Sequence, residues 1–408
     1  MSETGGESSG GAARVVIAGS GVGGLEAAFS LRALAADRVA ITMVSPDTHF
    51  SYRPMGVRDP FSLAGAEEYP LDAIAADLAV ELRRDRLASV QPSACTVRTT
   101  GGELIGYDHL LLAVGPLRSS VFAEALTLDD HRLGDQLAGL RADIERGEVE
   151  SVAFIAPRGT TWPLPIYELA FLTAAHAEDL GIDLSITVAT PEVAPLAVFG
   201  PEAAMAVRGM LHRAGISLRT GVRCQVPGDQ QLVLEPRGAV MHVDRIVGMP
   251  LLWGPSIPGL PSAAGGFVPV DPLSRVQGCD RVFAVGDMTD LPLKHGGIAG
   301  QQADLAAEAI AADIAGIAEP RPRRLIAEAV LLGADRPVRL RAMLDPTGVA
   351  TRCAVASEPR GLPRDKLITR RLTPYLRQLD QARARRFLQA VIEPHGEAQP
   401  VDPPAVHV

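Results

Sequence analysis

Three glycines near the start of the chain, Gly19, Gly21 and Gly24, have the spacing most directly tied to chemistry. When a strand enters a helix through such a turn, backbone N–H groups and the helix dipole face an anion, which is how proteins hold the pyrophosphate of a dinucleotide. Gly19 would allow the tight turn, Gly21 would let the backbone approach the phosphates, and Gly24 would let the helix pack close to its strand. The alternative is a glycine-rich turn that binds nothing.

The sequence around these glycines predicts the elements that would position them. Residues 14–18 are expected to form a buried strand, 24–34 a helix and 39–44 a second strand. A strand, helix and strand within about thirty residues is the context that the glycine pattern requires. The second strand ends on Ser45, where an Asp or Glu usually holds a ribose, and Asp47 follows. A hydroxyl can also bond a ribose, so we expect this contact from Ser45 in preference to Asp47.

A second motif lies more than half the chain away. Residues 281–285 predict a strand that ends at Gly286 and Asp287. An acidic residue at the carboxyl end of a parallel strand lies where doubly wound folds bind ligands. Taken alone, Asp287 can equally be a helix cap or a solvated residue. A short apolar stretch, 107–115, ends on a glycine between the two motifs, and a further helix is predicted over 294–314.

In this order the motifs resemble those of the pyridine nucleotide-disulfide oxidoreductase superfamily over residues 14–315, about three quarters of the chain. Residues 48–54 and 165–168 are most similar to sulfide:quinone oxidoreductases and type II NADH dehydrogenases. The resemblance implies an α/β fold of two Rossmann-like, doubly wound domains with a C-terminal α+β extension, and noncovalent FAD. The implied parts are a disordered tail over 1–13, an FAD-binding domain over 14–118 and 246–318, a second nucleotide-binding-like domain over 119–245 and a C-terminal domain over 319–408.

The resemblance also implies a set of site residues. Asp287 would bond the ribityl chain, and the helix start at Gly297 would stabilise a reduced flavin through its dipole. Lys294 and His295 would add charge or donate a proton at the flavin edge; alternatively Lys294 is solvated and His295 bonds a turn. Glu168 is the candidate for proton transfer, although an acid near a helix start can simply favour the dipole. The full cofactor-binding set is Gly19, Ser20, Gly21, Val22, Gly24, Ser45, Arg53, Val90, Ala113, Val114, Gly115, Gly286, Asp287, Gly297 and Ile298.

The middle of the chain repeats the strand and helix pattern imperfectly. Residues 151–156, 167–178 and 186–189 predict a strand, a helix and a strand. The first turn carries one glycine, Gly159, among several prolines, which remove the amide donors that would hold a pyrophosphate. NAD(P)H binding is therefore doubtful here. Arg158 and Trp162 leave an unconventional phosphate and ring contact open.

The four cysteines, Cys95, Cys224, Cys279 and Cys353, are far apart and form no CxxC pair. Their spacing predicts reduced thiols and no metal site. In the resembling sulfide:quinone oxidoreductases, paired cysteines beside the flavin carry sulfur, but residues 160–162 are Thr, Thr and Trp in that neighbourhood. Cys353 would lie in the region of the other cysteine, and a lone thiol cannot close a disulfide cycle. The sequence therefore speaks against sulfide oxidation.

The motifs together predict an FAD-dependent oxidoreductase that passes two electrons through noncovalent FAD to or from a small molecule or quinone. One alternative is an NAD(P)H:quinone-type reductase with an atypical NAD(P)H site. The other is a flavin-binding protein with little turnover.

Composition limits the remaining classes of function. The 408 residues suggest two or three domains. The net charge is -9 and no Lys/Arg cluster is interleaved with aromatic residues, so we expect no nucleic-acid partner. The start of the chain lacks a secretory signal and no apolar stretch reaches the roughly 20 residues of a membrane span, so we expect a cytoplasmic protein. Residues 366–376 are amphipathic and would lie on a membrane surface or, interrupted by Pro374, cover a core.

Overall fold

The first of two parallel sheets is built from strands that lie far apart in the sequence. The structure is a computed structural model that describes residues 11–61, 67–128, 133–333, 336–345, 348–357 and 366–392. The sheet has the strand order β20-β9-β1-β2-β5, and every neighbouring pair is parallel. Its strands are β1 (Ala13–Ala18), β2 (Val39–Val44), β5 (Glu81–Arg83), β9 (His109–Leu112) and β20 (Val282–Ala284).

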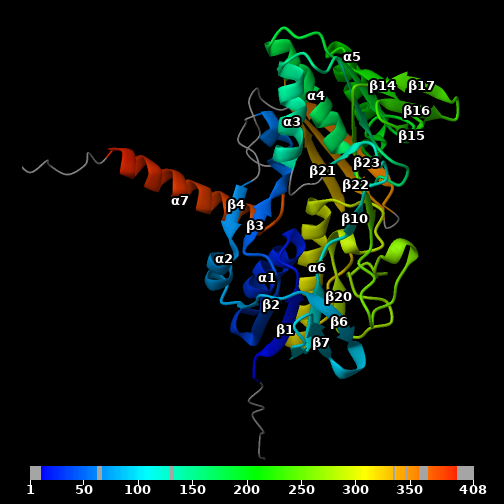
Figure 1. Cartoon of the computed structure of the whole chain (residues 1–408). Helices are drawn as coiled ribbons and strands as arrows, with labels where there is room; N and C mark the ends of the chain where they lie inside the picture. The colour runs from blue at the N-terminus through cyan, green and yellow to red at the C-terminus, as the bar shows by residue number, and fades with distance from the viewer. Residues whose placement is uncertain are drawn as a thin grey trace, which may run out of the picture.

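Two alanine-rich helices cover one face of this sheet. They are α1 (Val22–Ala35) and α6 (Gly296–Ala315), which lie side by side in Figure 1. Buried alanines on both helices, among them Ala27, Ala28, Ala303 and Ala307, share one apolar core with the strands. Because these side chains are small, the two helices can approach each other closely, and the turns at their first residues meet at one edge of the sheet.

A second parallel sheet forms the upper body of the molecule in Figure 1. Its strand order is β11-β18-β12-β13-β14. The strands are β11 (Leu126–Thr127), β12 (Ser151–Ile155), β13 (Ser185–Ala189), β14 (Ser217–Arg219) and β18 (Arg245–Gly248), and the helices around them are α3 (Leu133–Glu145), α4 (Leu164–Asp179) and α5 (Gly200–Arg213). An antiparallel sheet of β15 (Arg223–Gly228), β16 (Gln231–Glu235) and β17 (Ala239–His242) follows α5 and β14.

The C-terminal part adds an antiparallel sheet and a long helix. The sheet contains β21 (Ile326–Leu331), β22 (Val338–Leu344) and β23 (Ala350–Ser357), and its buried side chains join the core of the second parallel sheet. Helix α7 (Leu372–Ile392) starts against α1 and then projects away from the body (Figure 1). No helix in the described ranges is long and apolar enough to cross a membrane.

Smaller elements complete the structure around the parallel sheets. Strands β10 (Leu117–Ser119) and β19 (Leu251–Trp253) pair antiparallel, as do β3 (His49–Tyr52) and β4 (Glu67–Pro70). The remaining elements are helix α2 (Leu71–Asp77) and the strands β6 (Leu87–Gln91), β7 (Thr96–Thr99) and β8 (Leu104–Gly106).

The predicted α/β fold class is confirmed, and several local predictions need correction. Residues 266–269, whose sequence predicts a strand, do not form one, and Val268 makes only an isolated bridge. Helix α4 begins at Leu164, earlier than predicted, because Pro165 suits a first helical turn. Pro374 likewise lies in the first turn of α7 and does not interrupt it. The predicted domain boundaries stay predictions, and most of the predicted tail lies outside the described residues.

The packing at Gly24 predicts a loss of stability on substitution. A Cβ at Gly24 would lie 1.9 Å from the backbone oxygen of Gly19, which cannot move without breaking the turn. We expect Gly24→Ala to lower the free energy of unfolding by about 1–3 kcal/mol. Gly139→Ala is the matched control, because this exposed helical glycine has nothing within 4 Å of a new Cβ. Thermal unfolding followed by circular dichroism measures both, and an unchanged melting temperature for Gly24→Ala would contradict the prediction.

Candidate cofactor site

One large cavity of about 1190 Å³ runs along the carboxyl edge of the first parallel sheet. Its walls come from the β1–α1 turn, the end of β2, the segment after β9, the turn before α4, the start of α6 and the C-terminal sheet. Pockets for drug-sized ligands have volumes of about 300–1,000 Å³, so this main cavity has room for a dinucleotide.

The β1–α1 turn leaves space only toward the main cavity. Gly19 has a φ of 105°, and a Cβ there would lie 2.3 Å from the backbone oxygen of Ala113. At Gly21, by contrast, a Cβ would have no protein atom within 4 Å, and Gly21 lines the cavity. The first backbone N–H groups of α1 are left unpaired by the helix itself. This combination fits a ligand phosphate beside Gly21.

A cluster of hydroxyl and carboxyl groups lies next to this turn. Ser20 Oγ and Ser45 Oγ are 2.7 Å apart, and both are buried. Each also donates to Oδ2 of Asp47, at 3.4 and 3.3 Å. Ser45, from which we expected the ribose contact in preference to Asp47, is thus held between two polar partners. The exposed Asp47 carboxylate lies in the same wall. It supplies, two residues later, the acidic group that is absent at the end of β2.

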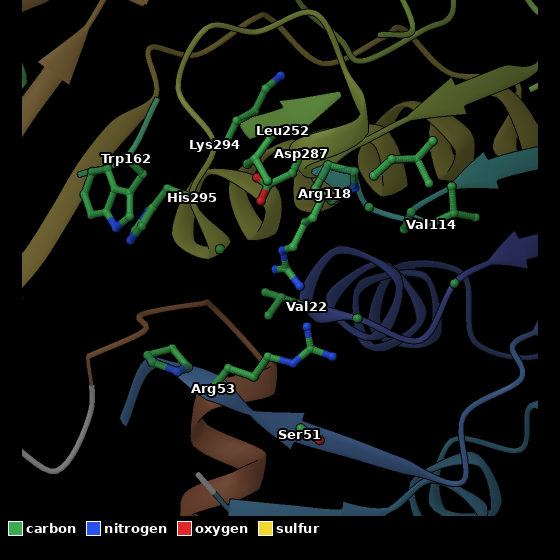
Figure 2. A pocket seen from close by; sticks show the side chains of 18 of the residues that line it. Val22, Ser51, Arg53, Val114, Arg118, Trp162, Leu252, Asp287, Lys294 and His295 are labelled. Atoms are coloured by element: carbon green, nitrogen blue, oxygen red, sulfur yellow. The ribbon is translucent and has the colours of Figure 1, made fainter. Parts of the chain in front are cut away.

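Two arginines extend toward the start of α1 from opposite walls. Figure 2 shows Arg53, after β3, and Arg118, in β10, with their guanidinium groups on either side of Val22. Arg53 belongs to the predicted set. Arg118 was missed, because its place beside α1 depends on a β10–β19 pairing that no local pattern indicates. Two cations at a helix start complement the charge of a pyrophosphate.

Asp287 lines the cavity near Arg118 (Figure 2) and lies directly after β20. The preceding Gly286 does not line the cavity. It has a φ of 76°, and its N–H donates to Oε1 of Gln302 at 2.8 Å, so α6 fixes the turn that presents Asp287. Gln301 similarly bonds the backbone of Ile326 in β21. Both glutamines therefore connect α6 to neighbouring backbone segments.

Lys294 is 4% exposed, so the solvated alternative is wrong. Its ammonium donates to the backbone oxygens of Thr289 and Leu291, the latter at 2.7 Å, and lies 3.9 Å from the centre of the Phe267 ring. In Figure 2 the amino group points away from Asp287. Burial lowers the pKa of Lys294 to about 8, while Asp287 and Asp290 oppose this shift. These contacts give Lys294 a structural role at the cavity wall.

His295 precedes α6 and packs against Trp162, with ring centres 4.4 Å apart. Burial, and then the nearby Lys366, lowers the pKa of His295 to about 4, so the ring is neutral at pH 7. Its Nδ1 is buried and has no hydrogen-bond partner among the described residues. His295 also lines a second, smaller cavity of about 320 Å³, together with Gly297, Ile326 and Ile368. It therefore lies in the wall between two cavities.

Glu168 forms a buried ion pair with a residue that the sequence did not suggest. Its Oε2 lies 2.6 Å from Nζ of Lys366, and its Oε1 accepts the N–H of Leu332 at 3.1 Å. The two side chains are 1% and 4% exposed, and both line the main cavity. Burial raises the pKa of Glu168, while the ammonium of Lys366 opposes this. A buried pair of this kind can hold or release a proton beside a ligand.

A compositional signal for Lys366 was present in the sequence. Of the 39 Lys and Arg residues, only Lys294 and Lys366 are lysines, and both are buried at the same cavity. The chain uses arginine for its surface cations. A lysine is a compact donor whose pKa shifts readily on burial, which arginine cannot provide.

The main cavity brings together most of the predicted site residues. Those that line it are Gly19, Ser20, Gly21, Val22, Ser45, Arg53, Ala113, Val114, Gly115, Glu168, Asp287, Lys294 and His295. Gly24, Val90, Gly286, Gly297 and Ile298 are not among its lining residues. Gly24 and Gly286 support the turns, whereas Val90 lies within an apolar core. Gly297 reaches the second cavity, and Ile298 is buried.

Polar and aromatic side chains near the turn before α4 contact other parts of the protein. Trp162, in the turn before α4, packs edge-on against the buried Phe199. Glu192, after β13, accepts bonds from the hydroxyl of Tyr167 at 2.7 Å and the N–H of Ala197 at 3.1 Å. The carboxylate of Glu192 therefore already accepts hydrogen bonds from within the protein. Arg158 is exposed and does not line the main cavity.

The cysteines are unpaired, and none lines the main cavity among the described residues. Cys353 lies in β23 near Gly200 and does not line the main cavity, so the structure does not bring it to the other predicted site residues. The described residues also contain no group of His, Cys, Asp and Glu that could hold a metal ion.

Comparison with known proteins finds likeness mainly in the fold. No family model matches the sequence. The sulfide-quinone reductase of Aquifex aeolicus (strain VF5) is 34% identical over 107 residues, which cover 26% of this chain and 25% of that relative. The match therefore spans about a quarter of the curated relative's length.

Solved structures extend the likeness over nearly the whole chain. The sulfide:quinone oxidoreductase from the hyperthermophilic bacterium Aquifex aeolicus has a TM-score of 0.75 at 20% identity, covering 93% of this chain and 91% of that one. An NAD-dependent persulfide reductase from A. fulgidus has a TM-score of 0.59 at 18% identity, covering 81% and 64%. These likenesses show that the chain shares its fold with the two oxidoreductases.

Proposed function

We propose that this protein is an FAD-dependent oxidoreductase. The observation that carries the proposal is the continuous main cavity, which joins the open side of Gly21 to Asp287 and to the start of α6. When bound, FAD supplies the transfer of two electrons as a hydride or electron pair. The protein supplies position, charge and protons.

Each part of the cavity has a chemical task in this proposal. The N–H groups after Gly21, with Arg53 and Arg118, hold the pyrophosphate. Ser45 and Asp47 hold the adenosine ribose, and Asp287 holds the ribityl chain. The start of α6, where the backbone of Gly297 lies, directs its positive dipole end toward the ring system.

The buried pair Glu168–Lys366 would manage protons for an acceptor. Its two charged groups reach the cavity from α4 and from the segment before α7. A quinone needs two protons as it takes two electrons, and the relative of similar fold is named a sulfide:quinone oxidoreductase. We propose that a quinone-type acceptor binds in the part of the main cavity that this pair lines, with His295 in the same wall.

The electron donor differs from sulfide in this proposal. No described cysteine lines the main cavity, and Thr160, Thr161 and Trp162 occupy the turn before α4. An NAD(P)H:quinone-type reductase remains the second candidate, since Trp162 offers a ring to stack on. Two observations count against this candidate. The carboxylate of Glu192 already accepts a hydrogen bond from Tyr167, and Arg158 is exposed. A cytoplasmic location stays a prediction from the sequence.

Substitution at Gly21 tests the cofactor. Because a Cβ at this position meets no protein atom, Gly21→Ala should keep the stability of the apoprotein but occupy phosphate space. We expect FAD affinity to fall at least about tenfold and the purified variant to lose its yellow colour. Fluorescence titration with FAD measures the affinity, with Gly139→Ala as control. Equal affinity in both variants would count against the site.

Substitution of Glu168 tests the proton step. We expect Glu168→Gln to slow reoxidation of photoreduced flavin by a soluble benzoquinone about a hundredfold. The wild-type rate should fall as pH rises through the raised pKa of Glu168, because only its protonated form donates, and the glutamine variant should lose this dependence. Glu178→Gln, exposed on the same helix, is the control. Identical pH profiles for wild type and Glu168→Gln would reject the role.

Anaerobic mixing with donors tests the missing sulfur chemistry. We expect sulfide, NADH and NADPH each to leave the visible absorbance of oxidised flavin unchanged over minutes, because the cavity lacks a cysteine pair and the middle domain lacks a pyrophosphate turn. Photoreduction of the same sample is the positive control. Rapid bleaching by NADH would favour the NAD(P)H:quinone-type alternative, and bleaching by sulfide would contradict the donor proposal.

A further inference from the structure

The segment that carries Lys366 to the cavity, residues 366–372, is held along its whole length, and we call it the strap. At its start, the hydroxyl oxygen of Tyr52 accepts the N–H of Lys366 at 3.2 Å and that of Leu367 at 2.9 Å. At its end, it becomes the first turn of α7. The strap therefore connects the ion pair at the main cavity to a long helix.

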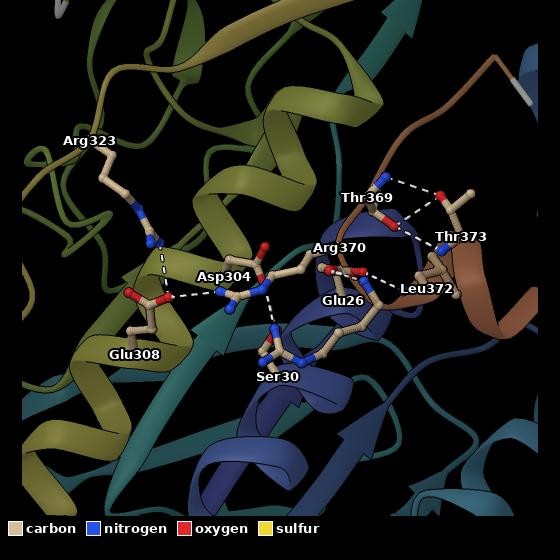
Figure 3. A network of polar contacts seen from close by, with 10 residues as sticks. Glu26, Ser30, Asp304, Glu308, Arg323, Thr369, Arg370, Leu372 and Thr373 are labelled. Carbon is tan, nitrogen blue, oxygen red and sulfur yellow. Dashed lines mark hydrogen bonds and ion pairs between the residues drawn. The ribbon is translucent and has the colours of Figure 1, made fainter.

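The end of the strap is fixed by a buried carboxylate from α1. Glu26 is completely buried, and its two oxygens accept the N–H groups of Arg371 at 2.8 Å and Leu372 at 2.7 Å (Figure 3). These are among the N–H groups that α7 cannot satisfy internally. Glu26 thus caps α7 from another helix, and its charge complements the positive end of the α7 dipole.

Further hydrogen bonds hold the strap to α1, to α6 and to the first turn of α7. Arg371 Nη1 lies 3.1 Å from both Ser30 Oγ and Asp304 Oδ1, and these two atoms are 2.5 Å apart. Thr369 and Thr373 bond reciprocally, each backbone N–H donating to the other's hydroxyl. Asp304 also faces Glu26, and burial together with this charge raises the pKa of Glu26. The strap therefore has little freedom to slide between Tyr52 and α7.

From this geometry we infer that Glu26 is a positioning residue, which holds Lys366 against Glu168 by fixing the end of the strap. The inference rests on the proposed proton role of the Glu168–Lys366 pair. Its consequence is that α1 sets two parts of the site at once. The helix directs its start at the cofactor phosphates, and one turn later it anchors the strap that places the ammonium group.

The two lysines of the chain allow a selective test on the FAD-loaded protein. Acylation with acetic anhydride, followed by mass spectrometry, gives separate rates for Lys366 and Lys294. Loss of the cap should raise the Lys366 rate about five- to tenfold in Glu26→Gln, because the strap then opens more often. Lys294 is held by other contacts, so its rate should stay the same. General unfolding would raise both rates together.

Glu308→Gln is the matched control. Glu308 lies on α6 in the same network and bonds Arg370 of the strap at 3.3 Å, but this contact is at the surface and contributes little (Figure 3). Neither lysine rate should change in this variant. Thr373→Val provides a second variant should Glu26→Gln fail to fold. It removes the bond that the Thr369 N–H donates to the Thr373 hydroxyl and the bond that this hydroxyl donates to the Leu367 oxygen, without touching α1. It should raise the Lys366 rate alone, by a smaller factor.

Flavin reoxidation by a soluble benzoquinone separates the two proposals. Glu26→Gln should slow it, and the double variant E26Q/E168Q should be no slower than E168Q, because both changes act on one ion pair. An unchanged Lys366 acylation rate, an equal rise for Lys294, or additive effects in the double variant would overturn the positioning role. If E168Q alone left reoxidation unchanged, the proton role would fail, while acylation of Lys366 would still decide whether Glu26 holds the strap.

Discussion

The buried ion pair between Glu168 and Lys366 is the contact on which the arrangement of the site depends. Its members lie 198 residues apart in the sequence and reach the cavity from the middle domain and from the C-terminal part. An ion pair in such a place costs desolvation energy that only close geometry and further hydrogen bonds can offset. The N–H of Leu332 supplies one of these bonds, so β21 is tied to the pair as well. Three segments distant in the sequence, α4, β21 and the segment before α7, therefore meet at an ion pair whose burial costs desolvation energy.

The second constraint is close approach at the edge of the first sheet. Gly24 lies against the backbone of Gly19, and Gly19 lies against Ala113, so β1, α1 and the segment after β9 meet without side chains between them. Alanines between α1 and α6 continue this packing. Because the two helices are close, their starts face one cavity, and Gln302 of α6 can reach the turn at Gly286. Backbone proximity thus places the two distant sequence motifs in a common wall.

The sequence predicted those site residues whose positions follow from a short local motif. Gly19, Gly21 and Asp287 follow strands and are recognisable because each strand end needs a particular residue type. Arg118 and Lys366 were not predicted, since their positions depend on pairings between distant segments. Val90 was placed in the site by resemblance, yet its side chain packs into an apolar core and does not line the main cavity. Strand periodicity alone does not decide which face meets a ligand.

Lys294 and Lys366 line the same cavity but have different roles, because their hydrogen-bond partners differ. Lys294 donates to backbone oxygens and lies over Phe267, so its charge is shared among neutral groups and serves to close a turn. Lys366 instead pairs directly with the carboxylate of Glu168. The proton chemistry proposed for this cavity therefore belongs to the Glu168–Lys366 pair and depends on the strap that holds the pair in place.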